Sequence, residues 1–65
     1  MTKIKLAIVD DHQIVIDGLL SLLGSHPAFE IVCTTTEPLK LIEFLDRHSV
    51  DILLTNSWIA IWKEL

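Results

Sequence analysis

The feature that most constrains this chain is the largely apolar run Ile4–Val9, which ends abruptly in Asp10, Asp11 and His12. Runs rich in Ile, Leu and Val and bounded by polar residues are typical of strands buried on both faces, as in a parallel sheet. In open α/β sheets, ligands bind just beyond the carboxyl ends of such strands. The run therefore predicts a central strand that carries two carboxylates and an imidazole to a binding edge.

The acidic pair predicts a metal site. Two adjacent carboxylates repel each other unless a cation or a proton relieves the repulsion. Hard oxygen ligands of this kind suit Mg²⁺, which commonly takes one or two carboxylates and keeps several waters. We therefore expect Asp10 and Asp11 to hold Mg²⁺ weakly. The alternative is that Asp11 only caps the helix that follows, because Asp is a favoured N-cap residue.

Periodicity along the chain predicts alternating strands and helices. Apolar residues at three-and-four spacing predict one helix over residues 12–25 and a second over residues 37–48. Short β-branched runs predict strands over residues 29–34 and 50–55. The order β-α-β-α-β is typical of right-handed βαβ units. We expect an α/β fold with a three-stranded parallel sheet.

Single residues within this pattern mark where the helices begin and end. Gly24 is expected to end the first helix, and Pro38 suits the first turn of the second. Thr35 or Thr36 is the expected cap of that second helix. Gly18 lies inside the first helix, where a close approach between helix and strand would explain a glycine.

The last nine residues, 57–65, form an apolar tail outside this alternation. Trp58, Ile61, Trp62 and Leu65 have helical spacing, although the two tryptophans also alternate as in a strand. We expect an irregular or helical tail. So small a fold has little room to bury two tryptophans. We therefore expect Trp58 and Trp62 to be buried against a partner chain, as oligomer contacts.

Composition narrows the class of protein. The chain has 65 residues, enough for one small domain that buries only about 60% of its unfolded surface. A hydrophobic content of 51% is high for so small a monomer and predicts either a piece of a larger fold or a protomer that hides apolar surface against a partner, with a homo-oligomer as the expected assembly. The net charge of −4 disfavours nucleic-acid binding. One cysteine excludes an internal disulfide, and no apolar run is long enough to span a membrane, so a cytoplasmic protein is expected.

The assembled motifs resemble the receiver domain of two-component response regulators, particularly the NarL/LuxR-type regulators that carry a helix-turn-helix output domain. The opening motif of that group, "VDDHxxVxxGLxxLL", is matched by Asp10-Asp11-His12, Val15, Gly18-Leu19 and Leu22-Leu23. Residues 29–32 and 50–55 match the family's second and third strands. The resemblance covers about residues 3–56. It implies the N-terminal half of a flavodoxin-like fold, with a sheet in the order 2-1-3.

The resemblance also implies a chemistry that this chain cannot complete. In the family, the counterparts of Asp10 and Asp11 hold Mg²⁺ beside a phosphoacceptor aspartate at the end of the third strand. Asn56 occupies that slot here. A neutral amide is no nucleophile for an acyl phosphate, and its presence removes one negative charge from the metal site. A histidine kinase partner is implied by the family alone.

The resemblance stops suddenly after Asn56, where Ile59-Ala60 replace the family's Met-Pro. We therefore divide the chain into a truncated receiver-like domain, residues 1–56, and a divergent tail, residues 57–65. A shortened chain, a shifted reading frame or a decayed gene would each produce this end. The third strand would then be an open edge, at which two copies could pair.

Three functions remain open at this point. The first is a phosphorelay receiver, not an enzyme, with a vestigial acidic Mg²⁺ site and no working phosphoacceptor. The second is a pseudo-receiver that acts through oligomer contacts without phosphorylation. The third is an unrelated small α/β enzyme that uses Asp10, Asp11 and His12 as metal ligands or acid–base groups. The DNA-binding output domain of full-length relatives has no counterpart in these residues.

Overall fold

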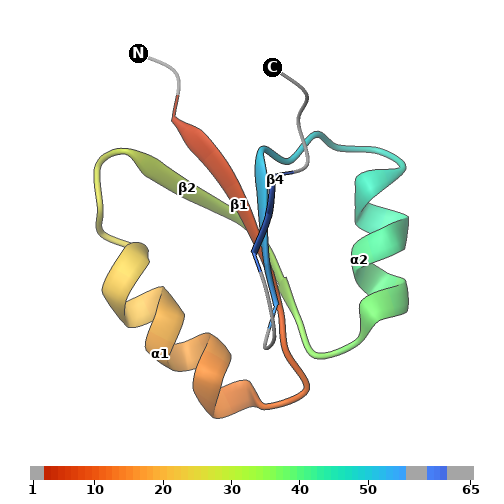
Figure 1. Cartoon of the computed structure of the whole chain (residues 1–65), viewed down its shortest axis with the longest axis horizontal. Coiled ribbons are helices and arrows are strands. Elements are labelled where there is room, and N and C mark those ends of the chain that lie inside the picture. The colour runs from red at the N-terminus through yellow and green to blue at the C-terminus, as the bar shows by residue number, and fades with distance from the viewer. Residues whose placement is uncertain (1–2, 56–58, 62–65) are drawn as a thin grey trace.

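Strands and helices alternate along the chain, as predicted. The structure, a computed structural model, describes residues 3–55 and 59–61. Its elements are β1 (Ile4–Val9), α1 (Gln13–Leu23), β2 (Phe29–Thr35), α2 (Pro38–Leu45), β3 (Ile52–Thr55) and β4 (Ile59–Ile61). The first three strands are parallel and lie in the order β2-β1-β3, which confirms the predicted half of a flavodoxin-like fold. Figure 1 shows α1 and α2 on opposite faces of this sheet.

β1 is the centre of the molecule because it has a parallel neighbour on each side. Its residues Leu6, Ala7 and Ile8 are buried. Alternate side chains of a strand point to opposite faces. Ala7 packs in a cluster with Leu41 of α2, Leu53 of β3 and Val50, which lies just before β3. The opposite face of the sheet is covered by α1, whose Ile16 is fully buried like Ile8 of β1.

The side chain of Asp51 extends the pairing between β1 and β3 beyond the ladder itself. The amide of Lys5 donates to the Asp51 carboxylate at 2.9 Å. The Asp51 amide donates in turn to the Lys5 carbonyl, also at 2.9 Å. This reciprocal pair aligns the start of β3 with the start of β1.

The structure of α1 corrects two predictions, one at its N-cap and one at Gly18 inside the helix. His12, and not Asp11, is the N-cap of α1, and it makes no side-chain capping hydrogen bond. Gly18 has nothing within 4 Å of where a Cβ would lie, so the predicted close approach to a strand is wrong. Gly24 does end α1, but with an ordinary right-handed backbone. A Cβ at Gly24 would lie 2.5 Å from the carbonyl oxygen of Leu20, which is why a glycine suits this position.

The start of α2 follows the prediction at Pro38 but not at its cap. Pro38 lies in its first turn, where no N–H is needed. The N-cap of α2 is Glu37, which makes no side-chain capping hydrogen bond, so the predicted threonine cap is wrong. The amide of Glu37 donates to the hydroxyl oxygen of Thr35 at 3.0 Å, which links the start of this helix to the end of β2.

The expectation of a helical or irregular tail is wrong at residues 59–61, which form β4. This strand pairs with β3 in antiparallel register, with Ile52 opposite Ile61 and Leu54 opposite Ile59. The helix prediction relied on side-chain spacing, whereas the unpaired amides and carbonyls of β3 gain partners only if the chain turns back as a strand. The third strand is therefore not the open edge of the sheet, and edge-to-edge pairing through β3 is not available. Trp58 and Trp62 lie outside the described residues.

Within the described part of the chain, neither helix has the length and apolar content needed to cross a membrane.

Candidate acidic site

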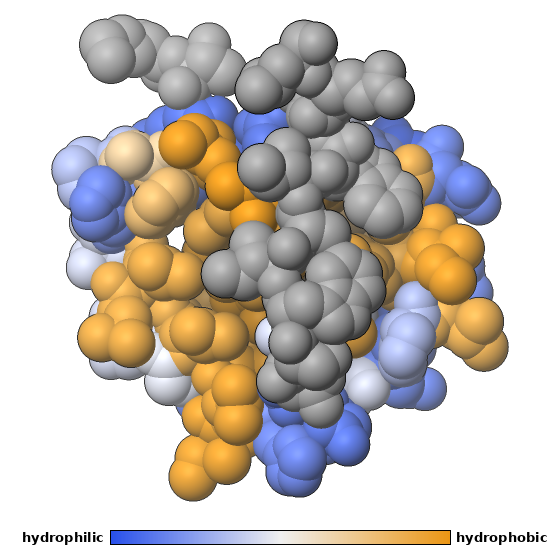
Figure 2. Space-filling view, in the orientation of Figure 1, coloured by the Kyte–Doolittle hydropathy of each residue, from blue (hydrophilic) through white to orange (hydrophobic). Residues whose placement is uncertain are grey.

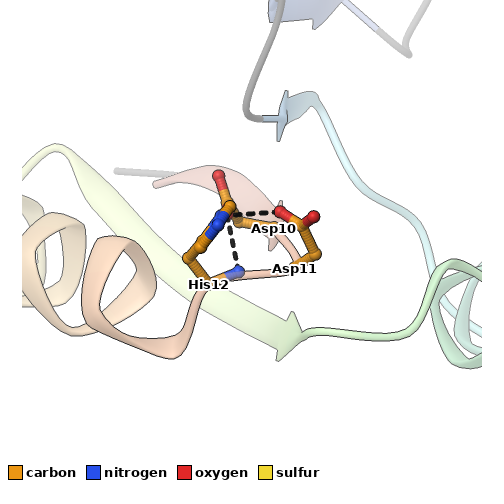
Figure 3. Close-up of side chains that lie close together, drawn as sticks. All are labelled: Asp10, Asp11 and His12. Atoms are coloured by element: carbon orange, nitrogen blue, oxygen red, sulfur yellow. Dashed lines mark hydrogen bonds and ion pairs between the residues drawn. The ribbon is translucent and has the colours of Figure 1, made fainter.

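Three polar side chains gather where β1 ends and α1 begins. Asp10, Asp11 and His12 each present one ligand atom, and these atoms lie within 4.8 Å of one another (Figure 3). They stand at the carboxyl edge of the central strand, as the sequence predicted. They are also the three residues that immediately follow the buried run.

Asp10 is the buried member of this group, with its side chain only 2% exposed. Its amide donates to the carbonyl of Thr35 in β2, at 3.2 Å. Its carboxylate oxygen Oδ1 accepts a hydrogen bond from the backbone N–H of His12 at 2.8 Å. A carboxylate can be buried at this turn because the turn itself supplies donors.

The imidazole of His12 bridges the two carboxylates. Its Nδ1 lies 2.7 Å from Oδ1 of Asp11 and 3.2 Å from Oδ1 of Asp10. A carboxylate accepts hydrogen bonds, so these contacts are hydrogen bonds in the ring tautomer that carries its hydrogen on Nδ1. The sequence indicated that His12 lies beside the pair but not that its ring turns back onto both carboxylates.

This donor set fits a divalent cation. Asp10 and Asp11 offer carboxylate oxygens, the ligand type that Mg²⁺ prefers. Asp11 is 69% exposed at its side chain and leaves an open approach from solvent. A cation bound here would compete with the His12 ring for the same oxygens.

Position 56 follows the neighbouring strand end. β1 and β3 finish in register, with Val9 beside Thr55, so Asp10 and Asn56 are the next residues of two adjacent parallel strands. Asn56 itself lies outside the described residues. The predicted convergence of Asn56 with the acidic pair therefore stays a prediction.

The other two histidines and the cysteine do not belong to this acidic site. Nδ1 of His26 accepts a hydrogen bond from the Ala28 amide at 3.0 Å, and the His48 ring stacks on Phe44 with centroids 4.4 Å apart. Burial raises the pKa of the Cys33 thiol above its ordinary value. Over residues 3–55 and 59–61, no second trio of His, Cys, Asp or Glu ligand atoms lies this close together.

Comparison with known proteins identifies relatives by sequence, but it identifies neither a family model nor a solved structure. No family model and no solved structure matches the chain. A protein-glutamate methylesterase/protein-glutamine glutaminase of Bordetella pertussis is 38% identical over 53 residues, which are 82% of this chain and 15% of the relative. The transcriptional regulatory protein DegU of Brevibacillus brevis is 31% identical over 54 residues, which are 83% of this chain and 23% of the relative.

These relatives share a module and not a whole-protein activity. Each match covers over four-fifths of this chain but less than a quarter of the relative, and the two relatives have different named activities. The fold and the acidic edge define the shared part as a small α/β module built on a parallel sheet. The chain belongs to the receiver domains of two-component response regulators and corresponds to the N-terminal half of that domain. Phosphorelay signalling is the setting of this family.

Proposed function

We propose that this chain is a non-enzymatic receiver module that binds Mg²⁺ weakly through Asp10 and Asp11 and is not phosphorylated at position 56. The observation that carries the proposal is the acidic pair at the carboxyl end of the central strand, with ligand atoms within 4.8 Å of one another. Membership of this family implies a histidine kinase as its partner, and we place both proteins in the cytoplasm.

The chemistry of position 56 separates this chain from a phosphorylatable receiver. Transfer to an aspartate forms a bond between a carboxylate oxygen and phosphorus while the bond from phosphorus to the donor's leaving group breaks. The amide of Asn56 carries no anionic oxygen for that attack. Bound Mg²⁺ would supply charge neutralisation for an incoming phosphoryl group, but there is no nucleophile at position 56 to receive it.

Intact-mass measurement tests the phosphorylation half of the proposal. The chain is incubated with a small-molecule phosphodonor and Mg²⁺, and we expect no gain of a phosphoryl group. A gain that disappears in an Asp11→Ala variant would contradict the proposal, because it would show a working phosphoacceptor that depends on the metal site.

A Mg²⁺ titration tests the metal half. Trp58 is two residues beyond Asn56 in the sequence, so tryptophan fluorescence is the signal to follow. We expect a saturable change in the millimolar range that is lost in Asp11→Asn. Asp17→Asn is the matched control, since Asp17 is an exposed carboxylate on α1 that accepts a hydrogen bond from Gln13. An identical titration curve for Asp11→Asn and the native chain would overturn the metal site.

A second function, association without phosphorylation, is supported by exposed apolar side chains on both helices. Ile14 and Leu22 of α1 are 80% and 75% exposed, and Leu39 and Ile42 of α2 are 72% and 55% exposed. Large aliphatic side chains gathered on the surface of a small domain are typical of an interaction site. A pseudo-receiver that acts as a homo-oligomer would use such a surface.

A further inference from the structure

The imidazole ring of His12 ties the two carboxylates of the acidic site to each other. Its Nδ1 lies 2.7 Å from Oδ1 of Asp11 and 3.2 Å from Oδ1 of Asp10 (Figure 3). Neighbouring carboxylates repel each other, and a hydrogen placed between them relieves the repulsion. A ring nitrogen without a hydrogen would instead turn its lone pair toward both carboxylates, which only accept hydrogen bonds when ionised. The geometry therefore favours the tautomer that carries its hydrogen on Nδ1.

The ring makes these contacts at an accessible position. The side chain of His12 is 65% exposed, whereas that of Asp10 is buried. Figure 2 shows hydrophilic surface at the bottom of the view, where β1 runs into α1 in Figure 1. The Asp10 carboxylate does not depend on the ring alone, because its Oδ1 also accepts a hydrogen bond from the backbone N–H of His12 at 2.8 Å. The ring can therefore move into solvent while this backbone hydrogen bond still holds the buried carboxylate.

The ring and a divalent cation make opposite demands on the same oxygens. Carboxylate oxygens of Asp10 and Asp11 are the donor atoms that suit Mg²⁺. While the ring donates to Oδ1 of each residue, it uses lone pairs that would otherwise face the cation. An Nδ1 that carries a hydrogen has no lone pair to offer, so in this tautomer Nδ1 is not itself a ligand. Releasing the ring costs its hydrogen bonds, and this cost lowers the affinity for the cation.

We infer that His12 is an internal competitor for the acidic site. In the metal-free chain its ring holds Asp10 and Asp11 through Nδ1–H, and the ring swings into solvent when these carboxylates take a divalent cation. The inference rests on the Mg²⁺ site proposed above and identifies the residue that sets its affinity. It concerns residues that adjoin in the chain, at the end of β1, and its contacts all lie within that turn.

Nuclear magnetic resonance of the imidazole nitrogens in the full chain tests the tautomer, under conditions where the rings are neutral. We expect the hydrogen of His12 on Nδ1. His26 is the internal control with the opposite tautomer, because its Nδ1 accepts a hydrogen bond from the Ala28 amide at 3.0 Å. Addition of Mg²⁺ is expected to shift the ring signals of His12 and to leave those of His26 in place. A metal-free His12 with its hydrogen on Nε2 would overturn the inference.

Removal of the ring tests the competition itself. His12→Ala keeps the backbone N–H that holds Asp10, and it removes no side-chain cap from α1. We expect it to bind Mg²⁺ roughly three- to tenfold more tightly than the native chain, the range that one or two exposed hydrogen bonds contribute. The backbone amide signals of the turn report the binding curve, and circular dichroism confirms that each variant is folded.

His48→Ala is the matched control, because it removes an exposed imidazole that stacks on Phe44 of α2, away from the acidic pair. We expect it to leave the Mg²⁺ affinity unchanged. Equal or weaker binding by His12→Ala, relative to the native chain, would overturn the competitor and leave the Mg²⁺ site standing. Failure of the native chain and both variants to bind Mg²⁺ would overturn the site itself, and this inference with it.

Discussion

At the scale of single residues, Asp10 and His12 show how a turn stabilises a buried carboxylate. The backbone N–H of His12 and its ring nitrogen both point at Oδ1 of Asp10, which is nearly inaccessible to solvent. Asp11, one position later, is exposed and interacts with the same ring. Two identical side chains thus play different parts, since one continues the buried face of β1 and the other begins the turn.

Two glycines of α1 allow a matched prediction. Gly24→Ala would place a methyl group 2.5 Å from the carbonyl oxygen of Leu20, so we expect a loss of about 1–2 kcal/mol in unfolding free energy. Gly18→Ala meets no atom and is expected to gain about 0.5–1 kcal/mol, because alanine restricts the unfolded chain and favours a helix. Urea denaturation at low protein concentration measures both. Equal effects of the two substitutions would contradict this account.

Asp51 gives a second prediction at this scale. Asp51→Ala removes the acceptor of the Lys5 amide and is expected to cost about 1–2 kcal/mol. Asp51→Asn keeps a side-chain oxygen at that position and is expected to stay within about 0.5 kcal/mol of the native chain. Thermal unfolding of the two variants compares them directly. If Asp51→Asn were as unstable as Asp51→Ala, then the hydrogen bond to Lys5 would not be the source of the effect.

At the scale of elements, β4 determines what the half-fold presents to its surroundings. Its antiparallel pairing with β3 satisfies an edge that would otherwise offer unpaired amides and carbonyls to another chain. The edge of a sheet is a template for association only while it is open. Covering β3 therefore makes β2 and β4 the edge strands of the sheet in the described residues.

Shortening the chain tests the role of β4. A chain that ends at residue 58 lacks β4, and we expect it to form larger, β-rich assemblies through the uncovered edge of β3. A chain that ends at residue 61 is the control, because it retains β4 and loses only residues 62–65. Sedimentation velocity and thioflavin T fluorescence follow the assemblies. Two shortened chains with the same sedimentation profile would show that β4 does not protect the edge.

At the scale of the whole molecule, the small core links stability to pH through one thiol. Cys33 packs against the cluster of Ala7, Leu41, Val50 and Leu53. Burial raises the pKa of this thiol above its ordinary value of 9.0. The folded chain therefore holds the thiol proton at pH values where the unfolded chain has begun to release it, and the resulting stability is lost as the pH rises from about 9 through the folded pKa.

We therefore expect a steeper alkaline loss of stability in the native chain than in Cys33→Ala. Urea denaturation at pH 8 and at pH values above about 9 measures the difference between the two chains. The difference should be constant below the ordinary thiol pKa and shrink above it. A difference that does not vary with pH over the whole range would show that the environment of Cys33 does not disfavour the thiolate.

The sequence by itself determined the order of elements and the place of the acidic pair. Apolar periods and breaks are local properties, so β1, α1, β2, α2 and β3 lie close to their predicted ranges, and the polar residues after Val9 are necessarily at the end of a strand. The family resemblance came from the same local motifs, and the relatives confirm it.

Only the tertiary structure decided the features that depend on neighbours. Residues 59–61 form a strand because β3 lies alongside with unpaired backbone groups, a fact that side-chain spacing does not contain. Gly18 faces open space and not a strand, and the His12 ring turns back onto two carboxylates. These features depend on which groups meet across the fold. A local sequence pattern predicts such contacts only where it also identifies the group on the other side.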